Sequence, residues 1–238
     1  MINEKTYHNR VAKIFNQKRK NDYIWQIPEE KYFRPLINIT SNILDIGCGP
    51  AVAINNLLPH KYLGKYIGVD ISKRMIDFAK RNYSNGVYFV TTFDNLPKEC
   101  KNCDVFLSLG SLHHSINQIT TFSYWINRLP INSYLLLREP LYEALKKGEG
   151  ASPEEEGINI AEITKVINKH NVRLLKTIYF CSKFIHCFNK AYLKINNKNS
   201  KFLYILWKIF YDIDIALCNL LPHKLIKPEA VILILYKP

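Results

Sequence analysis

Two carboxylates and two glycines in the first third of the chain have the spacing of a ligand-binding turn. Asp45 lies within a short aliphatic run and is followed by Gly47 and Gly49. The run predicts a buried strand, and the glycines predict a tight turn into an apolar helical run over 51–58. Ligands of open α/β sheets bind at such junctions, because glycines let a ligand approach the backbone and helical N–H groups face it.

The residues around this turn favour a nucleoside without phosphates. Val52 stands where a dinucleotide fingerprint needs its third glycine, and the charge of Asp45 would repel a pyrophosphate but accept an amino or hydroxyl group. A second aliphatic run over 66–70 ends in Asp70, 21 residues after Gly49 (70 − 49). A carboxylate there can accept both hydroxyls of a ribose. NAD therefore fits less well.

Three further residues could handle a proton. His113 and His114 follow an apolar strand predicted over 103–110, and Glu139 follows another predicted over 133–138. A histidine with a pKa near neutrality can remove a proton from a hydroxyl. Two alternatives stay open: one histidine could cap or pack the next helix, over 118–129, and Glu139 could pair with Arg138 or a lysine.

The Asp-x-Gly-x-Gly motif, with later motifs in order over roughly 36–176, resembles the class I methyltransferases that use S-adenosylmethionine (AdoMet). Many members carry a similar Leu-His-His, and the resemblance places these imidazoles near the methyl group. It implies AdoMet as cofactor, S-adenosylhomocysteine as product and no metal. The cofactor residues it implies are Asp45, Gly47, Cys48, Gly49, Asp70, Ile71, Met75, Thr92, Phe93, Asp94 and Leu109.

The adenine end departs from the family pattern. Members of the family usually show an acid, a small residue and a second acid before Leu-Pro, whereas this chain has Thr92, Phe93 and Asp94. A threonine hydroxyl accepts a hydrogen bond more weakly than a carboxylate, so Asp94 is expected to take over or the affinity to be modest. The resemblance also implies that Ile71 and Met75 wall the adenine.

Two absences bear on the acceptor. The turn after the fourth strand lacks the Asn/Asp/Ser-Pro-Pro-aromatic sequence of enzymes that methylate base amines, and no cysteine adjoins a proline, as ring-carbon methylation of pyrimidines requires. The favoured function is methyl transfer to a hydroxyl, with an amine as near rival, of a small or medium-sized acceptor that can be sugar- or lipid-linked. Alternatives are an RNA methyltransferase using the basic flanks and a non-catalytic AdoMet-binding protein.

The net charge of +13 is concentrated at the two ends of the chain. Residues 1–40 carry 8 Lys/Arg against 4 Asp/Glu and residues 181–238 carry 9 against 3, which leaves 16 against 13 in the middle. Lys18-Arg19-Lys20 is the only basic run. Solvated positive surface is the favoured interpretation, followed by an anionic substrate or membrane surface, with nucleic acid last.

The whole chain, 1–238, is expected to form a single methyltransferase domain. We predict a Rossmann-like, doubly wound α/β fold with a mostly parallel seven-stranded sheet. A helical leader over 1–40, with helices within 5–25 and over 29–37, precedes a cofactor-binding core over 41–180. A helical insertion over 181–229 precedes the last strand, in 230–238. In similar methyltransferases such a leader covers the cofactor, so Tyr7, Phe15 and Tyr23 are candidates to touch AdoMet or substrate, or only to pack.

The insertion before the last strand holds apolar residues at helical spacing: Phe202, Leu206, Ile209, Ile213, Leu217 and Leu220. It is interpreted as a cap over the substrate pocket, a dimer face, or an interfacial helix that puts Tyr204, Trp207 and Tyr211 at a lipid surface. Its charges interrupt any membrane span. A Gly- and Glu-rich stretch over 146–157 is predicted to be a mobile loop that could close over the substrate.

The cysteine content and the N-terminus indicate a cytoplasmic protein, with membrane association as an alternative. No secretory signal is visible, so the six cysteines are expected to stay reduced. Cys100-x-x-Cys103 could be half of a zinc site, with Cys181, His186 and Cys187 as distant partners, but loop thiols are favoured. The oligomeric state is left open.

Overall fold

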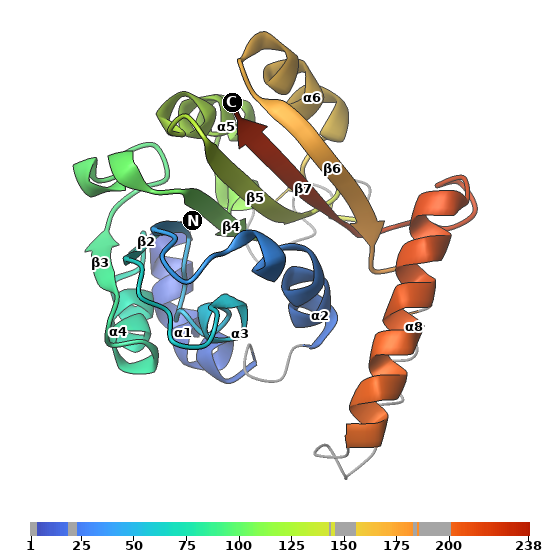
Figure 1. Cartoon of the computed structure of the whole chain (residues 1–238), viewed down its shortest axis with the longest axis horizontal. Coiled ribbons are helices and arrows are strands. Elements are labelled where there is room, and N and C mark those ends of the chain that lie inside the picture. Colours follow the sequence, from blue (N-terminus) through green and yellow to red (C-terminus); the bar gives the residue numbers. More distant parts are fainter. Residues whose placement is uncertain (1–3, 19–22, 143, 146–155, 183–184, 186–200) are drawn as a thin grey trace.

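The structure is a computed structural model that describes residues 4–18, 23–142, 144–145, 156–182, 185 and 201–238 (Figure 1). Seven strands form one sheet in the order β3-β2-β1-β4-β5-β7-β6. Strand β7 runs antiparallel to both β5 and β6, and all other neighbouring strands are parallel. Their bounds are β1 Ile43–Ile46, β2 Tyr66–Asp70, β3 Val87–Val90, β4 Val105–Leu109, β5 Ser133–Pro140, β6 Arg173–Phe180 and β7 Ala230–Lys237. This confirms the predicted doubly wound, mostly parallel fold.

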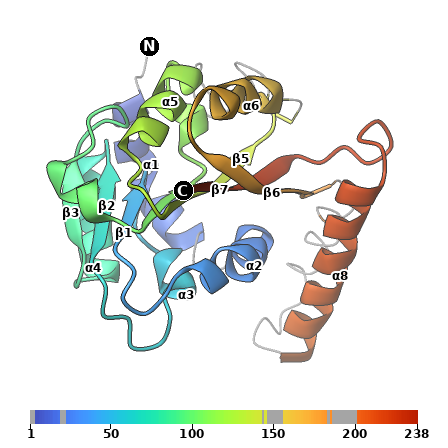
Figure 2. The ribbon, with the colours of Figure 1, turned by 45° about the horizontal axis from the view of Figure 1, so that its top comes forward.

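Helices cover both faces of the sheet (Figure 2). The apolar side chains of α2 (Tyr23–Tyr32), α3 (Ile54–Leu57), α4 (Lys73–Asn82) and α8 (Lys201–Leu220) belong to the core on one face. Those of α5 (Gln118–Arg128) and α6 (Ile160–Lys169) belong to the core on the other. The remaining helix, α1 (Glu4–Lys18), packs on α4. The order of the strands reverses between β1 and β4, so ligands are expected outside the carboxyl ends of these two strands.

Two helix boundaries differ from the predictions. The helix after the glycine turn was expected over 51–58 but is confined to α3, because Ala51 has a φ of 53° that a helix cannot use. In the leader, Pro28 was expected to precede a helix, yet it lies inside α2, and a short 3-10 turn at Arg34–Leu36 follows. Ile27 and Glu29, on either side of Pro28, are both buried. Packing of this helix therefore outweighs the hydrogen bond that proline cannot make.

The last helix, α8, runs along the outer side of the molecule beyond the edge strand β6 (Figure 1). Of the apolar residues noted at helical spacing, Ile209, Ile213 and Leu220 are exposed, whereas Trp207 and Tyr211 are fully buried. Burial contradicts the placement of these two aromatic rings at a lipid surface, and the side chain of Tyr204 lies outside the described residues. Because α8 carries apolar residues on both sides, the periodicity of the sequence alone does not indicate which side faces the core.

Two polar side chains of α8 fix it to the sheet. Asn219 donates to the carbonyl of Tyr179 at 2.7 Å and accepts its N–H at 3.1 Å, so it caps the edge strand β6. Asp214 is fully buried and accepts the N–H groups of Cys181 and Ser182 as well as the Ser182 hydroxyl. No helix among the described residues combines the length and apolarity needed to cross a membrane.

Candidate active site

The turn after β1 has room only for glycine at its first position. Gly47 has a φ of +70°, and a Cβ added there would lie 2.2 Å from the Cβ of Ser111. Gly49 also lies in the left-handed region, at +53°. Ser111, which follows β4, donates through its hydroxyl to the carbonyl of Ile46 at 2.7 Å. The glycine turn is therefore locked against the end of β4, a contact that the sequence motif does not reveal.

Asp45 lies just before this turn and is almost fully enclosed, with 3% of its surface exposed. The hydroxyl of Tyr66, on the neighbouring strand β2, donates to Asp45 Oδ2 at 2.7 Å. Burial, and then the charge of Asp45, raise the pKa of the Tyr66 phenol well above its ordinary value. The phenol consequently stays protonated and donates to the carboxylate at any ordinary pH.

Asp70, at the end of β2, connects the glycine turn to the start of α4. Its two carboxylate oxygens accept the N–H of Gly49 at 2.9 Å and the N–H of Ser72 at 2.8 Å. Burial raises the pKa of Asp70 above its ordinary value, although the two N–H groups and the charge of nearby His8 oppose the shift. Each oxygen keeps a lone pair for a further donor, as a ribose hydroxyl would require.

A pocket of about 610 Å³ opens beside these residues. Five of the predicted site residues line it: Ile71, Thr92, Phe93, Asp94 and His114. The Phe93 ring is held by Trp125, whose indole N–H donates to the Phe93 carbonyl at 2.8 Å. Its edge comes within 3.4 Å of the position that a Cβ on Gly47 would take. The pocket therefore adjoins the glycine turn and offers an apolar wall for a flat ring.

Three further predicted cofactor residues have little or no role at the pocket surface in this structure. Met75, on α4, is buried, with 2% of its surface exposed. Leu109 is 8% exposed at the end of β4. The Cys48 thiol lies close to Gly68, where a Cβ would come 2.9 Å from its Sγ. Burial raises the pKa of this thiol well above its ordinary value, so Cys48 is a neutral space-filling group.

The two histidines form a short 3-10 turn, η4 (Leu112–His114), that Glu139 holds in place. Glu139 is fully buried and accepts the N–H groups of Ser111 at 3.1 Å and Leu112 at 3.0 Å. It also contacts Nδ1 of His113 at 2.8 Å. Burial alone would raise the pKa of Glu139, but the hydrogen bond and charge of His113, the Leu112 N–H and the charge of Arg138 together lower it. Glu139 therefore stays ionised inside the fold.

Of these three candidates for a base, only His114 lines the pocket. Its ring stacks at 4.0 Å on that of His113 and meets the ring of His8 edge-on at 4.7 Å. His113 is 8% exposed and Glu139 has no exposed surface. The structure thus arranges Glu139, His113 and His114 in a row that begins in the core and ends at the pocket, so Glu139 reaches the pocket only through the histidines.

The leader reaches the pocket with side chains that the sequence did not single out. Lys5 and His8 of α1 line it, while Tyr7 is half-buried, lies edge-on to His8 and is not among the lining residues. Asn9 anchors the helix by accepting the Ser72 hydroxyl at 2.7 Å. The side chains of Phe15 and Tyr23 lie outside the described residues. Sequence reasoning favoured aromatic residues, and the weak periodicity of this polar helix gave no signal for its inward face.

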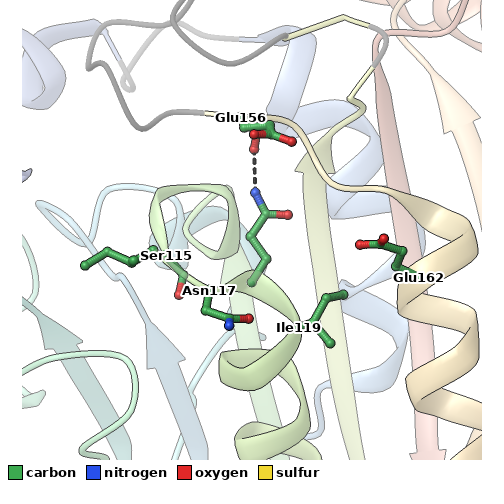
Figure 3. Close-up of a pocket in the computed structure, with 7 residues that line it drawn as sticks. Ser115, Asn117, Ile119, Glu156 and Glu162 are labelled. Atoms are coloured by element: carbon green, nitrogen blue, oxygen red, sulfur yellow. Dashed lines mark hydrogen bonds between the residues drawn. The ribbon is translucent and has the colours of Figure 1, made fainter.

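A second hollow of about 350 Å³ continues from the first and shares Ser115, Ile116 and Asn117 with it (Figure 3). Its far side is formed by Glu162 of α6 and by Glu156, at the end of the predicted mobile loop over 146–157, most of which lies outside the described residues. Gln118 also lines the hollow and donates to the Glu156 carbonyl at 2.7 Å. This hollow is therefore lined largely by hydrogen-bonding groups.

A buried ion pair connects the leader to the same edge of the sheet. Arg138 Nε of β5 donates to Glu29 of α2 at 2.9 Å, and Nη2 of the same guanidinium donates to the Leu109 carbonyl at 2.7 Å. A Cβ on Gly110, which has a φ of +80°, would come within 2.5 Å of this guanidinium. The predicted pairing of Glu139 with Arg138 is replaced here by Glu29, a residue 109 positions away that no local pattern could indicate.

The Cys100 and Cys103 thiols are both buried, beside the 3-10 turn Lys98–Asn102. Burial is the main cause that raises the pKa of Cys103 to about 12. Neither thiol is thus disposed to ionise at neutral pH. Within the residues that the structure describes, no group of three or more His, Cys, Asp or Glu side chains could hold a metal ion. His186 and Cys187 lie outside those residues.

Part of the chain is similar in sequence to known methyltransferases. Residues 43–129 match a family described as a methyltransferase domain. A viral protein described as a candidate methyltransferase, 235L of Invertebrate iridescent virus 6, is 28% identical over 121 residues. The match spans 50% of this chain and 45% of the viral protein, so this chain spans less than half the length of that relative.

Two solved structures share the fold at low sequence identity. One is a candidate sarcosine dimethylglycine methyltransferase from Galdieria sulphuraria, with a TM-score of 0.61 and 13% identity, which covers 89% of this chain and 83% of that one. The other is geranyl diphosphate C-methyltransferase from Streptomyces coelicolor A3(2), solved with S-adenosyl-L-homocysteine. Its TM-score is 0.57 at 9% identity, with 89% of this chain and 79% of that one covered.

Proposed function

We propose that this chain, whose residues 43–129 belong to the methyltransferase-domain family, transfers the methyl group of AdoMet to a hydroxyl or amine of a small or medium-sized polar acceptor. The observation that carries the proposal is the place of His114. It lines the same pocket as Ile71, Thr92 and Phe93, at the carboxyl edge where β1 and β2 present Asp45 and Asp70.

The residues at this edge fit AdoMet. Asp70 would accept the ribose hydroxyls, because both of its oxygens are already oriented by backbone N–H groups. Phe93 and Ile71 would hold the adenine, and the glycine turn beside Asp45 would admit the methionine end. When bound, AdoMet supplies a methyl group on a positively charged sulfonium. The protein then contributes mainly orientation of the acceptor and acceptance of its proton.

His114 is proposed as the proton acceptor. His114 lines the pocket, so its imidazole is within reach of an acceptor there. His113 and Glu139 are positioning residues, because the carboxylate fixes the turn that carries both imidazoles. The proton of an acceptor hydroxyl would pass to the His114 imidazole as the oxygen attacks, and an amine would release its proton there after transfer.

The second hollow is proposed as the place of the acceptor. It joins the pocket at Ser115, Ile116 and Asn117, beside His114, and its walls offer the carboxylate of Glu162 and the amide of Gln118. Such groups bind hydroxyl-rich or amine-bearing molecules. A sugar or an amino group on a larger carrier would fit this chemistry, which keeps sugar- and lipid-linked acceptors among the proposed substrates.

The test is an acceptor screen with methyl-labelled AdoMet, followed by kinetics of His114→Ala. We expect turnover to fall by about 10² or more, while the affinity for S-adenosylhomocysteine stays within about threefold. His60→Ala is the matched control, since His60 is an exposed histidine away from the pocket. Turnover of His114→Ala within about tenfold of wild type would remove His114 as the base, whereas no transfer to any acceptor by wild type would count against the function itself.

A further inference from the structure

The exposed side of α8 carries an apolar stripe. Ile205, Ile209 and Ile213 follow one another at every fourth position and are 55%, 50% and 43% exposed. Leu220 continues the row at 82%, and Leu225, in the turn after the helix, is 73% exposed. Residues four apart lie on one face of a helix, so the three isoleucines form one apolar row, and the two leucines extend the apolar surface toward and beyond the end of α8. We call these five residues the α8 stripe.

The stripe is not a by-product of a helix that packs loosely. The opposite side of α8 holds Trp207, Tyr211 and Cys218, all fully buried. It also holds the buried carboxylate of Asp214, which accepts the N–H of Cys181 just after β6. A helix with one well-packed apolar face ordinarily turns a polar face to water. Here the outward face is apolar as well, and a contiguous apolar surface of this kind marks a contact site.

The charge around the α8 stripe is positive. Residues 181–238 hold 9 lysines against 3 acidic residues, a difference of 6. Among the described residues, Lys208, Lys224 and Lys227 are exposed on α8 and the turn that follows it. Of the three acids, Asp214 is buried and Asp212 pairs with Lys31 at 2.6 Å. Exposed lysines thus flank the apolar row on α8 and in the turn after it.

We propose that the α8 stripe and its flanking lysines dock this protein on an anionic membrane surface, with α8 lying in the plane of the interface. An apolar row bordered by lysines is the pattern of helices that bind there, and each lysine that meets anionic lipid strengthens binding by about fivefold. A second copy of the chain is the less suitable occupant, because it would bring the exposed Lys208, Lys224 and Lys227 of two copies against each other.

The docking surface is independent of the proposed methyl transfer. It lies beyond β6 at the edge of the sheet, whereas the pocket lies at the carboxyl ends of β1, β2 and β4. Membrane binding can therefore fail while cofactor binding succeeds, and the reverse. If both hold, the enzyme would meet its acceptor at a lipid surface.

The experiment is co-sedimentation of the full chain with vesicles of phosphatidylcholine alone and of phosphatidylcholine with an equal share of phosphatidylglycerol. The stripe variant combines Ile205→Ser, Ile209→Ser and Ile213→Ser. Its matched control combines Ile39→Ser, Leu63→Ser and Ile131→Ser, three apolar residues that are exposed elsewhere, at 49%, 75% and 70%. A charge variant, with Lys208, Lys224 and Lys227 each changed to Gln, leaves the apolar row intact. Binding of S-adenosylhomocysteine and the Tm report whether each variant is folded.

We expect wild type and the control to bind the anionic vesicles and not the neutral ones. The stripe variant should partition at least about tenfold less, and the charge variant should lose most of its preference for anionic lipid. Absence of binding by wild type overturns the proposal, as does a folded stripe variant that binds like wild type. A wild-type dimer in sedimentation velocity that the stripe variant dissociates would also overturn it, by assigning the surface to a second copy.

Discussion

At Asp70, burial and hydrogen bonding act in opposite directions on one carboxylate. Burial favours the neutral acid, whereas the N–H groups of Gly49 and Ser72 favour the charged form, and burial prevails. The cost of keeping this carboxylate ionised is offset when further donors reach it, as the two hydroxyls of a ribose would. Asp70 is therefore suited to bind a ligand, because hydroxyl donors from the ligand would stabilise a charge that burial disfavours in the empty protein.

This balance predicts a pH dependence of cofactor binding. Because the pKa of folded Asp70 lies above the ordinary value of 3.8, the carboxylate gains its proton at a higher pH than an ordinary aspartate does. The affinity for S-adenosylhomocysteine should therefore begin to fall while the pH is still above that value, and it should fall less in Asp70→Asn. The contribution of Asp70 to the stability of the empty protein changes with pH in the opposite direction. It is fully present below pH 3.8, where the carboxyl is protonated in both the folded and the unfolded state, and it is lost as the pH rises through the folded pKa. Calorimetric titrations over this pH range check the prediction, and a wild-type affinity that is constant down to pH 3.8 would refute it.

For Glu139 we expect the opposite dependence of folding stability on pH. Its pKa in the fold is lowered, so its stabilising contribution is present above the ordinary value of 4.5 and is lost as pH falls through the folded pKa. Glu139→Gln keeps one oxygen for the Ser111 and Leu112 N–H groups but removes the buried charge and puts an NH2 group beside His113, so we expect a loss of about 1–3 kcal/mol in the free energy of unfolding at neutral pH. Denaturant unfolding should show this difference shrinking on acidification. A deficit that is the same at neutral and acid pH would mean that the charge of Glu139 plays no part.

Among the elements, the central strands β1, β2, β4 and β5 were the most predictable from sequence, because buried parallel strands require apolar runs, and these end close to the observed bounds. The inward face of α8 was not, since both of its faces are apolar. The contribution of α1 to the pocket was also missed, because Lys5 and His8 lie on a polar helix whose docking depends on Asn9 and on residues over 60 positions away. Contacts of that range leave no local pattern.

The Arg138 and Glu29 pair gives an element-scale prediction, since it joins α2 to β5 inside the protein. Glu29→Leu should cost about 3–5 kcal/mol in the free energy of unfolding, because it leaves the Arg138 guanidinium buried without the carboxylate that accepts its Nε hydrogen bond. The double variant Glu29→Leu with Arg138→Leu should lose clearly less than the two single losses added together. Glu99→Leu, at an exposed position, serves as control. Additive losses in denaturant unfolding would show that the pair does not act as a unit.

For the whole molecule, the resemblance to methyltransferases and the fold could be predicted from residues that are close together in sequence, whereas the residues that enclose the pocket could not. The glycine turn, Asp70 and the histidines each stand at the end of a strand, and the strand order brings those ends to one edge. Lys5 and His8 of the leader line one side of the pocket, and residues of α5 and α6 line the hollow beside it. If the hollow holds the acceptor as proposed, the choice of acceptor depends on these elements and hence on tertiary structure rather than on the glycine motif.

Calorimetric titration of the intact protein with S-adenosylhomocysteine tests the central claim most directly. We expect wild type to bind below the millimolar range, and Asp70→Asn to bind about 10- to 100-fold more weakly through loss of charge-assisted hydrogen bonds. Asp77→Asn is the matched control, because Asp77 lies on α4 in an exposed pair with Lys73, and it should bind like wild type. No binding by wild type at millimolar ligand, or equal affinities for Asp70→Asn and Asp77→Asn, would contradict a cofactor site at this edge of the sheet.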